Sequence, residues 1–212
     1  FETPLAITMG DPSGIGPEII LKSVVETKLN NFLIFGDSLV FDSLIKSLGL
    51  PLTINKISEL SEAIFEEDYI NLFETSKLNH LPHYGKISKE CGKASFDAIM
   101  KSIELAKQGK VSGIVTAPIS KKALNLAHIN YPGHTEILAG YSNNKAVSMM
   151  LLNKHIKTVL VTLHCSMKQA LDRITIQNEL DAIINADLGC KLFGIEKPVI
   201  AVAALNPHAG EN

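Results

Sequence analysis

The sequence predicts an α/β fold with mostly parallel sheets. Short apolar runs alternate along the chain with amphipathic helical patterns, and several of these runs are apolar at every position. Strands that are buried on both faces of a parallel sheet have this character. Hydrophobic residues make up 46% of the chain and charged residues 20%, which is typical of a soluble globular protein. A chain of 212 residues can form one large domain or two small ones.

Six stretches are expected to form strands, and two others to form long helices. The expected strands are residues 4–9, 31–36, 112–118, 146–152, 157–164 and 198–207. Apolar residues recur at helical spacing in residues 92–109 and 175–188, which predicts an amphipathic helix in each. The alternation of strand and helix is what favours a parallel sheet over an antiparallel one.

Composition excludes several classes of partner. The net charge is −2 and Arg173 is the only arginine, so nucleic-acid binding is not expected. No apolar run is long enough for a membrane span, and the first residues, "FETPLAITMG", lack a secretory signal pattern. Cys91, Cys165 and Cys190 are widely spaced, which disfavours a disulfide framework and fits a reducing compartment. We therefore expect a cytoplasmic protein without nucleic-acid or membrane partners.

Ligands of α/β folds bind at the carboxyl ends of the strands. The first such strand end along this chain lies in the stretch "ITMGDPSGIGPEII". Its strand is expected to end at Met9, and Pro17 and Glu18 suit the first turn of a helix that Ser13 could cap. The glycine spacing fits neither GxGxxG nor GxxxxGK[ST]. A tight strand-to-helix turn is therefore favoured, and a backbone loop lying close to a ligand is the alternative.

Two further strand ends carry residues suited to anions. Lys121 and Lys122 follow the apolar stretch 112–118 and could meet an anionic group, although a solvated lysine pair is commoner. His134 and Thr135 open an apolar-periodic helix after a Tyr-Pro-Gly turn. A helix start of this kind is a natural anion site, but Thr135 could equally be a simple cap and His134 a surface residue.

A pair of histidines suggests a metal. His164 ends one expected strand and His208 lies just past another, so parallel strands would bring both imidazoles to one rim of the sheet. That arrangement suits a divalent ion, or an ion with an acid/base group. Catalytic metals usually have three protein ligands, so one is still needed. The remaining histidines lie in polar stretches and do not supply it: His80, His83, His128 and His155.

Six stretches, in this order, resemble one enzyme family. They are "ITMGDPSGIGPEI", "GKISKECGKAS", "VTAPISK", "YPGHTE", "LVTLHCSMKQALDRIT" and "LNPHAGE", and they extend from Ala6 to Glu211. Together they resemble the 4-hydroxythreonine-4-phosphate dehydrogenases of pyridoxine phosphate biosynthesis. "YPGHTE" and "LNPHAGE" are the most specific of the six.

The resemblance implies a fold and an activity. The fold is similar to that of isocitrate and isopropylmalate dehydrogenases, with two α/β domains and a cleft, and it is not the Rossmann fold. The first domain is expected over residues 1–125, and residues 126–212 form part of a second whose remainder is missing from this chain. The implied enzyme is a homodimer with a shared active site. It uses NAD or NADP to oxidise 4-phosphooxy-L-threonine, and the ketone formed loses CO₂ to give 3-amino-2-oxopropyl phosphate.

The resemblance also implies roles for particular residues. His164 and His208 match two of the family's three histidine ligands to a divalent metal ion (zinc, magnesium or cobalt), and the third lies beyond the end of this chain. His134 and Thr135 match residues that contact substrate. No residue is assigned as the general base.

Three alternatives stay open. A dehydrogenase of another four-carbon phosphorylated acid, such as threonate or erythronate 4-phosphate, would share the metal and the cofactor. A phosphate acyltransferase-like enzyme would need no metal. A phosphoester-binding protein would bind without turnover.

Overall fold

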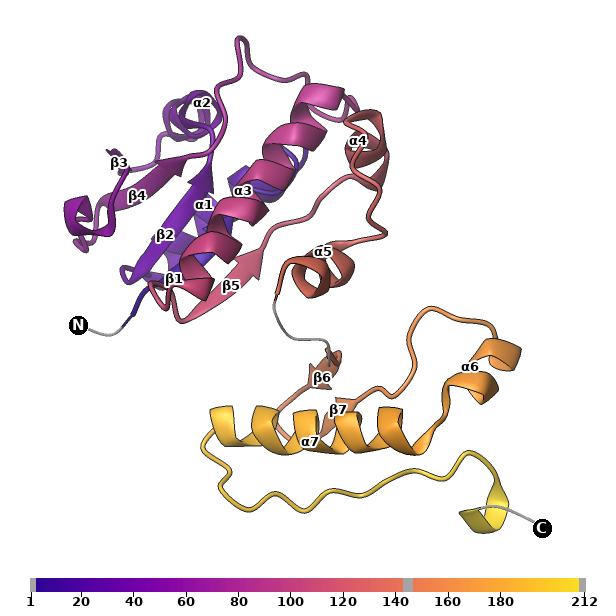
Figure 1. The fold of residues 1–212 in the computed structure, drawn as a ribbon. Coiled ribbons are helices and arrows are strands. Elements are labelled where there is room, and N and C mark those ends of the chain that lie inside the picture. The colour runs from indigo at the N-terminus through magenta and orange to yellow at the C-terminus, as the bar shows by residue number, and fades with distance from the viewer. Residues whose placement is uncertain (1–2, 143–146, 210–212) are drawn as a thin grey trace. The chain divides into compact units, whose positions relative to one another are not determined.

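The computed structural model describes residues 3–142 and 147–209. The chain forms two compact units, residues 1–143 and 144–212, and each is described by itself (Figure 1). The division near residue 125 concerns the domains of the whole protein, and it stays a prediction.

The first unit contains a five-stranded sheet in the order β3-β4-β2-β1-β5, and every neighbouring pair is parallel. The parallel α/β prediction is thus confirmed. Three of the strands were expected and two, β3 and β4, were not. The bounds are β1 Leu5–Thr8, β2 Phe32–Gly36, β3 Thr53–Ile57, β4 Tyr69–Glu74 and β5 Gly113–Thr116.

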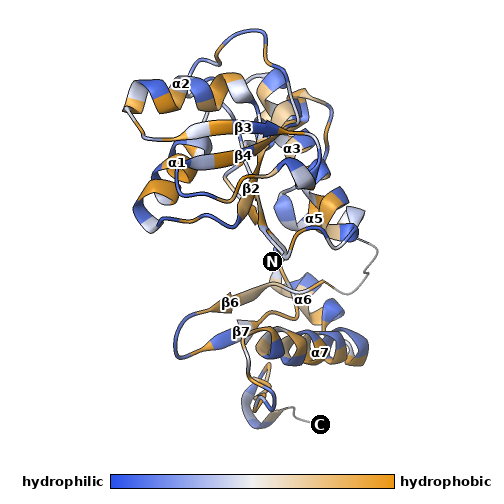
Figure 2. Cartoon of the chain, turned by 90° about the vertical axis from the view of Figure 1, so that its left-hand side faces the viewer, coloured by the Kyte–Doolittle hydropathy of each residue, from blue (hydrophilic) through white to orange (hydrophobic). Residues whose placement is uncertain are grey.

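Helices cover both faces of this sheet. Alternate residues of β1 point to opposite faces, so Ile7 joins the core under α1 and α2 while Ala6 joins the core under α3. Figure 2 shows hydrophobic and hydrophilic residues alternating along α2, as expected of a helix with one buried face. A third cluster, Ile99, Ile103, Leu124 and Ile137, joins α3 to α4 and α5. The bounds are α1 Gly16–Thr27, α2 Ser38–Leu48, η1 Leu60–Glu62, α3 Lys89–Lys107, α4 Lys121–Leu126 and α5 His134–Tyr141.

The second unit has a smaller, antiparallel sheet. β6 (Met150–Leu152) pairs with β7 (Lys157–Val159) as a short hairpin, so two expected strands are present but shorter and not parallel. The helix expected in residues 175–188 is confirmed as part of α7. The other elements are α6 Met167–Arg173, α7 Ile176–Leu192 and η2 Pro207–Ala209.

The expectation of a buried strand over residues 198–207 is wrong. No residue of this stretch is in a strand, and nearly all are exposed. An apolar run becomes a strand only when another strand satisfies its backbone hydrogen bonds, and within the described residues β6 and β7 pair only with each other. Among the described helices, none has the length and apolar character needed to cross a bilayer.

Candidate functional site

Three connections meet at the carboxyl edge of the five-stranded sheet. They follow β1, β5 and β4. The Asp11 N–H donates to the Pro118 carbonyl at 2.9 Å, which joins the β1 connection to the β5 connection. The Gly85 N–H donates to the Ser13 carbonyl at 2.8 Å, which brings the long connection after β4 to the same place. The sheet edge at which α/β folds bind ligands is therefore built from all three.

The β1 connection is a tight turn in which two glycines, Gly10 and Gly16, are sterically required. Gly10 has φ +74°, and a Cβ placed on it would lie 2.5 Å from the Pro118 carbonyl oxygen. A Cβ on Gly16 would overlap the Met9 carbonyl and come within 3.0 Å of the Ala117 Cβ. The favoured reading of this glycine stretch, a tight turn, therefore agrees with its packing.

Ser13 does not cap α1, contrary to expectation. Its N–H and its hydroxyl both donate to Asp11 Oδ1, at 2.9 and 2.8 Å, and both residues are buried. The helix starts at Gly16 without a side-chain cap, and Pro17 and Glu18 occupy its first turn as predicted. The local hydrogen bond within the turn outcompetes capping because Asp11 is only two residues away.

His134 and Thr135 open α5, as predicted. The N-cap residue is Gly133, so Thr135 is not the cap. His134 Nε2 is shielded from solvent and has no hydrogen-bond partner in the described part of the chain. Burial lowers the pKa of His134 below its ordinary 6.5, and a hydrogen bond to the Ala117 backbone offsets part of this effect. A neutral imidazole thus has one nitrogen available for a ligand. Contact with substrate stays a prediction.

Lys121 and Lys122 lie exposed at the start of α4. Ser120 caps this helix by accepting a hydrogen bond from the Ala123 N–H at 3.2 Å. Neither lysine forms an ion pair with a described carboxylate. The exposure of both lysines and their lack of an ion pair with described carboxylates agree with the interpretation that they are a solvated pair.

A cavity of about 490 Å³ lies between the connection after β4 and the first turns of α3. We call it the β4–α3 cavity. Its basic lining residues are Lys77, His80, His83, Lys86 and Lys93. His80 and His83, which lie in a polar stretch of the sequence, are exposed. Part of the lining, from Lys86 to Ala94, comes from the stretch "GKISKECGKAS", for which the sequence alone had suggested no site.

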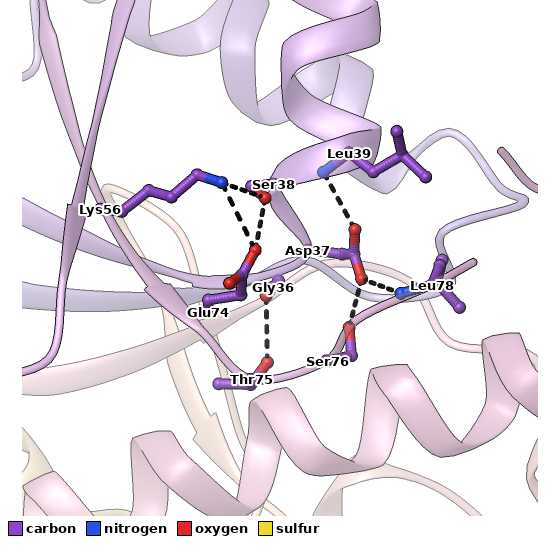
Figure 3. A network of polar contacts seen from close by, with 9 residues as sticks. All are labelled: Gly36, Asp37, Ser38, Leu39, Lys56, Glu74, Thr75, Ser76 and Leu78. Atoms are coloured by element: carbon purple, nitrogen blue, oxygen red, sulfur yellow. Dashed lines mark hydrogen bonds and ion pairs between the residues drawn. The ribbon is translucent and has the colours of Figure 1, made fainter. Parts of the chain in front are cut away.

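A buried carboxylate, Asp37, binds two residues that line this cavity, Ser76 and Leu78, and its contacts are drawn in Figure 3. Asp37 is 1% exposed, and its Oδ1 caps α2 by accepting from the Leu39 N–H at 3.0 Å. Its Oδ2 accepts from the Ser76 hydroxyl at 3.0 Å and from the Leu78 N–H at 2.8 Å. Asp37 therefore fixes the segment that leaves β4 against the start of α2.

A second polar group lies beside Asp37, also in Figure 3. Ser38 donates to Glu74, and Lys56 Nζ donates to the Ser38 hydroxyl at 2.7 Å. The Ser38 hydrogen bond, with a smaller contribution from Lys56, lowers the pKa of Glu74 and keeps it ionised. These contacts stiffen the carboxyl end of β4, where the cavity begins.

His164 and His208 do not sit at the ends of parallel strands, so that argument for the pair is wrong. β7 ends at Val159, and residues 160–163 separate it from His164, while His208 lies within η2. Both are exposed and have left-handed backbones, with φ of 46° and 63°. Such conformations are uncommon outside glycine and cluster at functional sites.

No metal site is complete in the described residues: no group of three or more His, Cys, Asp or Glu side chains there could hold an ion. Imidazole nitrogens do suit zinc and cobalt, so the donor type at His164 and His208 fits part of a site. Their role as ligands stays a prediction based on the resemblance.

Comparison with known proteins decides the family. The profile of the family described as "Pyridoxal phosphate biosynthetic protein PdxA" matches residues 28–212. The chain belongs to the PdxA family. A crystal structure from Klebsiella pneumoniae, described as a 4-hydroxythreonine-4-phosphate dehydrogenase, covers 99% of this chain with a TM-score of 0.88 at 34% identity. The isocitrate dehydrogenase-like fold that the resemblance implied is thereby confirmed.

Two curated relatives indicate the range of activities in the PdxA family. The 4-hydroxythreonine-4-phosphate dehydrogenase of Beijerinckia indica is 48% identical over all of this chain. A Fusobacterium nucleatum protein, named provisionally as a D-threonate 4-phosphate dehydrogenase, is 36% identical. This chain spans 63% of the first, 65% of the second and 66% of the Klebsiella chain. The activity of the whole protein is therefore taken up as a proposal.

Proposed function

We propose that the whole protein is a metal-dependent, NAD(P)-linked 4-hydroxythreonine-4-phosphate dehydrogenase. The observation that carries this proposal is the 48% identity, along the entire chain, with the Beijerinckia relative of that name. In 4-phosphooxy-L-threonine the hydroxyl-bearing carbon lies β to the carboxylate. Transfer of its hydride to NAD(P)⁺, with loss of the hydroxyl proton, gives a β-keto acid. This acid loses CO₂ and yields 3-amino-2-oxopropyl phosphate.

His134 and Thr135 are assigned to the substrate. A neutral imidazole can donate or accept a hydrogen bond without adding charge, and burial favours the neutral form of His134. The start of α5, an eight-residue helix, offers backbone N–H groups to an anionic oxygen beside the Thr135 hydroxyl. Their place next to Ala117, at the carboxyl edge of the sheet, agrees with this role.

His164 and His208 are assigned to a divalent ion, together with a third histidine outside this chain. When bound, the ion would supply a Lewis acid to the substrate oxygen that loses its proton. Both histidines are exposed to solvent. A homodimer with a shared active site belongs to the same proposal.

The test uses the whole protein stripped of metal. NAD or NADP and 4-phosphooxy-L-threonine are added with and without zinc, magnesium or cobalt, and formation of the reduced cofactor is followed by absorbance. We expect metal-dependent turnover that falls at least 100-fold in His164→Ala and in His208→Ala. The matched control is His155→Ala, because His155 is an exposed histidine in the β6–β7 turn. Turnover that ignores metal and both histidines contradicts the mechanism.

A second candidate function is oxidation of D-threonate 4-phosphate, which the Fusobacterium relative favours. This substrate carries a hydroxyl where the first carries an amine. Comparing kcat/KM for the two acids, and for erythronate 4-phosphate, decides between them. The higher identity to the Beijerinckia relative predicts a preference for the amino acid. Binding of these acids without turnover would favour a phosphoester-binding protein.

A further inference from the structure

A dehydrogenase needs a place for a nicotinamide dinucleotide, and this sequence has no GxGxxG motif. The candidate substrate residues lie at the β5 side of the sheet edge, on α5. On the other side of the β1 turn, the β4–α3 cavity has no role in the chemistry described so far. Its position at the carboxyl ends of parallel strands is where α/β folds bind nucleotides.

We propose that the β4–α3 cavity binds the nucleotide part of the nicotinamide cofactor, with Lys77 and Lys86 on its phosphates and Glu90 on a ribose. The inference rests on the proposed function, because it names the cofactor site of that same enzyme. The cavity volume of about 490 Å³ falls in the range of sites for small molecules and cofactors, roughly 300–1,000 Å³.

The lysines of the cavity differ in their partners. Lys93 is neutralised by Asp97, with Nζ 2.6 Å from Oδ2. Lys77 and Lys86 form no salt bridge with any carboxylate in the described ranges, although the charge of Lys77 contributes to lowering the pKa of the nearby Glu74. Two ammonium groups that no salt bridge engages at one cavity attract a ligand that carries adjacent negative charges, as a pyrophosphate does.

The start of α3 explains why the lysines, and not the helix, are assigned to the phosphates. Ser88 caps the helix by accepting from the Cys91 N–H at 3.1 Å. Glu90 accepts hydrogen bonds from its own N–H and from Ser88, which lowers the pKa of Glu90. Because this carboxylate already occupies the helix start, a phosphate placed there would meet a like charge.

Glu90 instead favours a nucleotide over a simple phosphate. An ionised carboxylate only accepts hydrogen bonds, and ribose hydroxyls are donors that match it. The cavity also has apolar walls at Leu78, Ile87 and Ala94, and Ile87 is 47% exposed. A base placed against these side chains would remove apolar surface from water. The cavity thus offers lysines to the phosphates, a carboxylate to the ribose and apolar side chains to the base.

The walls are fixed independently of any ligand. Asp37 holds Ser76 and Leu78 on one side, as described above. The Gly85 N–H bond to the Ser13 carbonyl holds the other side. A site with fixed walls loses little entropy when the ligand binds. The cavity is also tied, through the same β1 turn, to the segment beside His134.

The experiment measures binding without turnover. Metal-free whole protein is titrated with NADH and with NADPH, in the absence of substrate, and Kd is read from nucleotide fluorescence. We expect Lys77→Ala and Lys86→Ala each to weaken binding about fivefold, and the double variant at least twentyfold. The matched control is Lys110→Ala, an exposed lysine in the turn between α3 and β5, which leaves Kd unchanged. Because these lysines are on the surface, folding is preserved.

A second arm separates the dinucleotide from other phosphates. Calorimetry measures binding of inorganic phosphate and of 4-phosphooxy-L-threonine to the same variants, and Glu90→Gln is added to the nucleotide series. We expect Glu90→Gln to weaken NADH binding and to leave both phosphates unaffected. Variants that lose the phosphorylated acid but keep NADH overturn the inference, and so do variants that lose nothing. In either case metal-dependent turnover by the parent protein still supports the dehydrogenase. A parent that binds neither nucleotide contradicts the dehydrogenase itself.

Discussion

His134 makes the folding free energy depend on pH. Its pKa in the folded protein lies below the ordinary 6.5, chiefly because burial disfavours the charged ring. Below about pH 6.5 the unfolded chain therefore binds more protons than the folded chain, and stability falls as the pH is lowered. We predict that His134→Gln loses less stability between pH 7 and pH 5 than the parent, measured by urea denaturation. His155→Gln, which changes an exposed ring, keeps the parental slope.

Gly10 is predicted to be far less tolerant of a side chain than Gly109. Both have left-handed backbones, with φ of +74° and +68°. An added Cβ meets the Pro118 carbonyl oxygen at 2.5 Å in the first case and nothing within 4 Å in the second. Gly109→Ala should cost about 1 kcal/mol, the usual penalty for this conformation. Gly10→Ala should cost about 3 kcal/mol or more because backbone must also move.

Denaturant unfolding of the two glycine variants measures the difference directly. NMR of the His134 ring gives a second reading, because the overlap at Gly10 pushes on the backbone of Ala117, to which that ring is hydrogen-bonded. We expect the His134 signals to shift in Gly10→Ala and to stay in place in Gly109→Ala. Equal losses of stability in the two variants would contradict the steric argument.

Strands and helices were predictable where burial leaves a strong pattern. β1, β2 and β5 are continuous apolar runs, and α3 and α7 have clear helical spacing. β3 was missed because it is an outermost strand of the sheet. Its half-exposed positions are compatible with polar residues such as Asn55 and Lys56, so the apolar pattern is interrupted. The stretch 198–207 failed for the opposite reason: its hydrophobicity is evident, but the presence of a partner strand is not encoded locally.

Asp37 offers a way to loosen the cavity wall while keeping α2 intact. Asparagine caps a helix as well as aspartate, so Asp37→Asn can preserve the bond from the Leu39 N–H. The amide nitrogen would then replace Oδ2 and face two donors, the Leu78 N–H and the Ser76 hydroxyl. We predict a loss of about 1–3 kcal/mol in stability, since a buried acceptor is removed.

Hydrogen exchange of backbone amides shows which segment the Asp37→Asn substitution loosens. In Asp37→Asn the Leu78 amide should exchange faster while the first turn of α2 stays protected. Asp68→Asn, which alters an exposed carboxylate, is the control and should leave both unchanged. A stable variant with a slow Leu78 amide would show that the wall does not depend on Asp37.

The chain as a whole was recognisable from its six stretches, yet the arrangement of its site was only partly predictable. His134 and Thr135 were expected at a helix start and lie there. The β4–α3 cavity was not expected, because its lining stretch, residues 76–97, is held by contacts with distant residues such as Asp37 and Ser13. The metal pair was inferred from strand geometry that is wrong, and only the family resemblance still supports it.

The segment 199–205 exposes apolar side chains to solvent. Val199 is fully exposed, and Val202 and Leu205 are 57% and 59% exposed, with no strand partner in the described residues. Burying such side chains is favourable by about 25 cal/mol per Å². The Beijerinckia relative is longer, since this chain spans 63% of it. We predict that, in a chain of the relatives' full length, a strand from the remaining third covers this segment.

Hydrogen exchange tests the covering of this segment. In a protein of residues 1–212 the amides of 199–205 should exchange within seconds, and in a chain of the relatives' full length at least 100-fold more slowly. The β6–β7 turn at residues 153–156 is the internal control and should exchange alike in both. Equal exchange at 199–205 would contradict the covering.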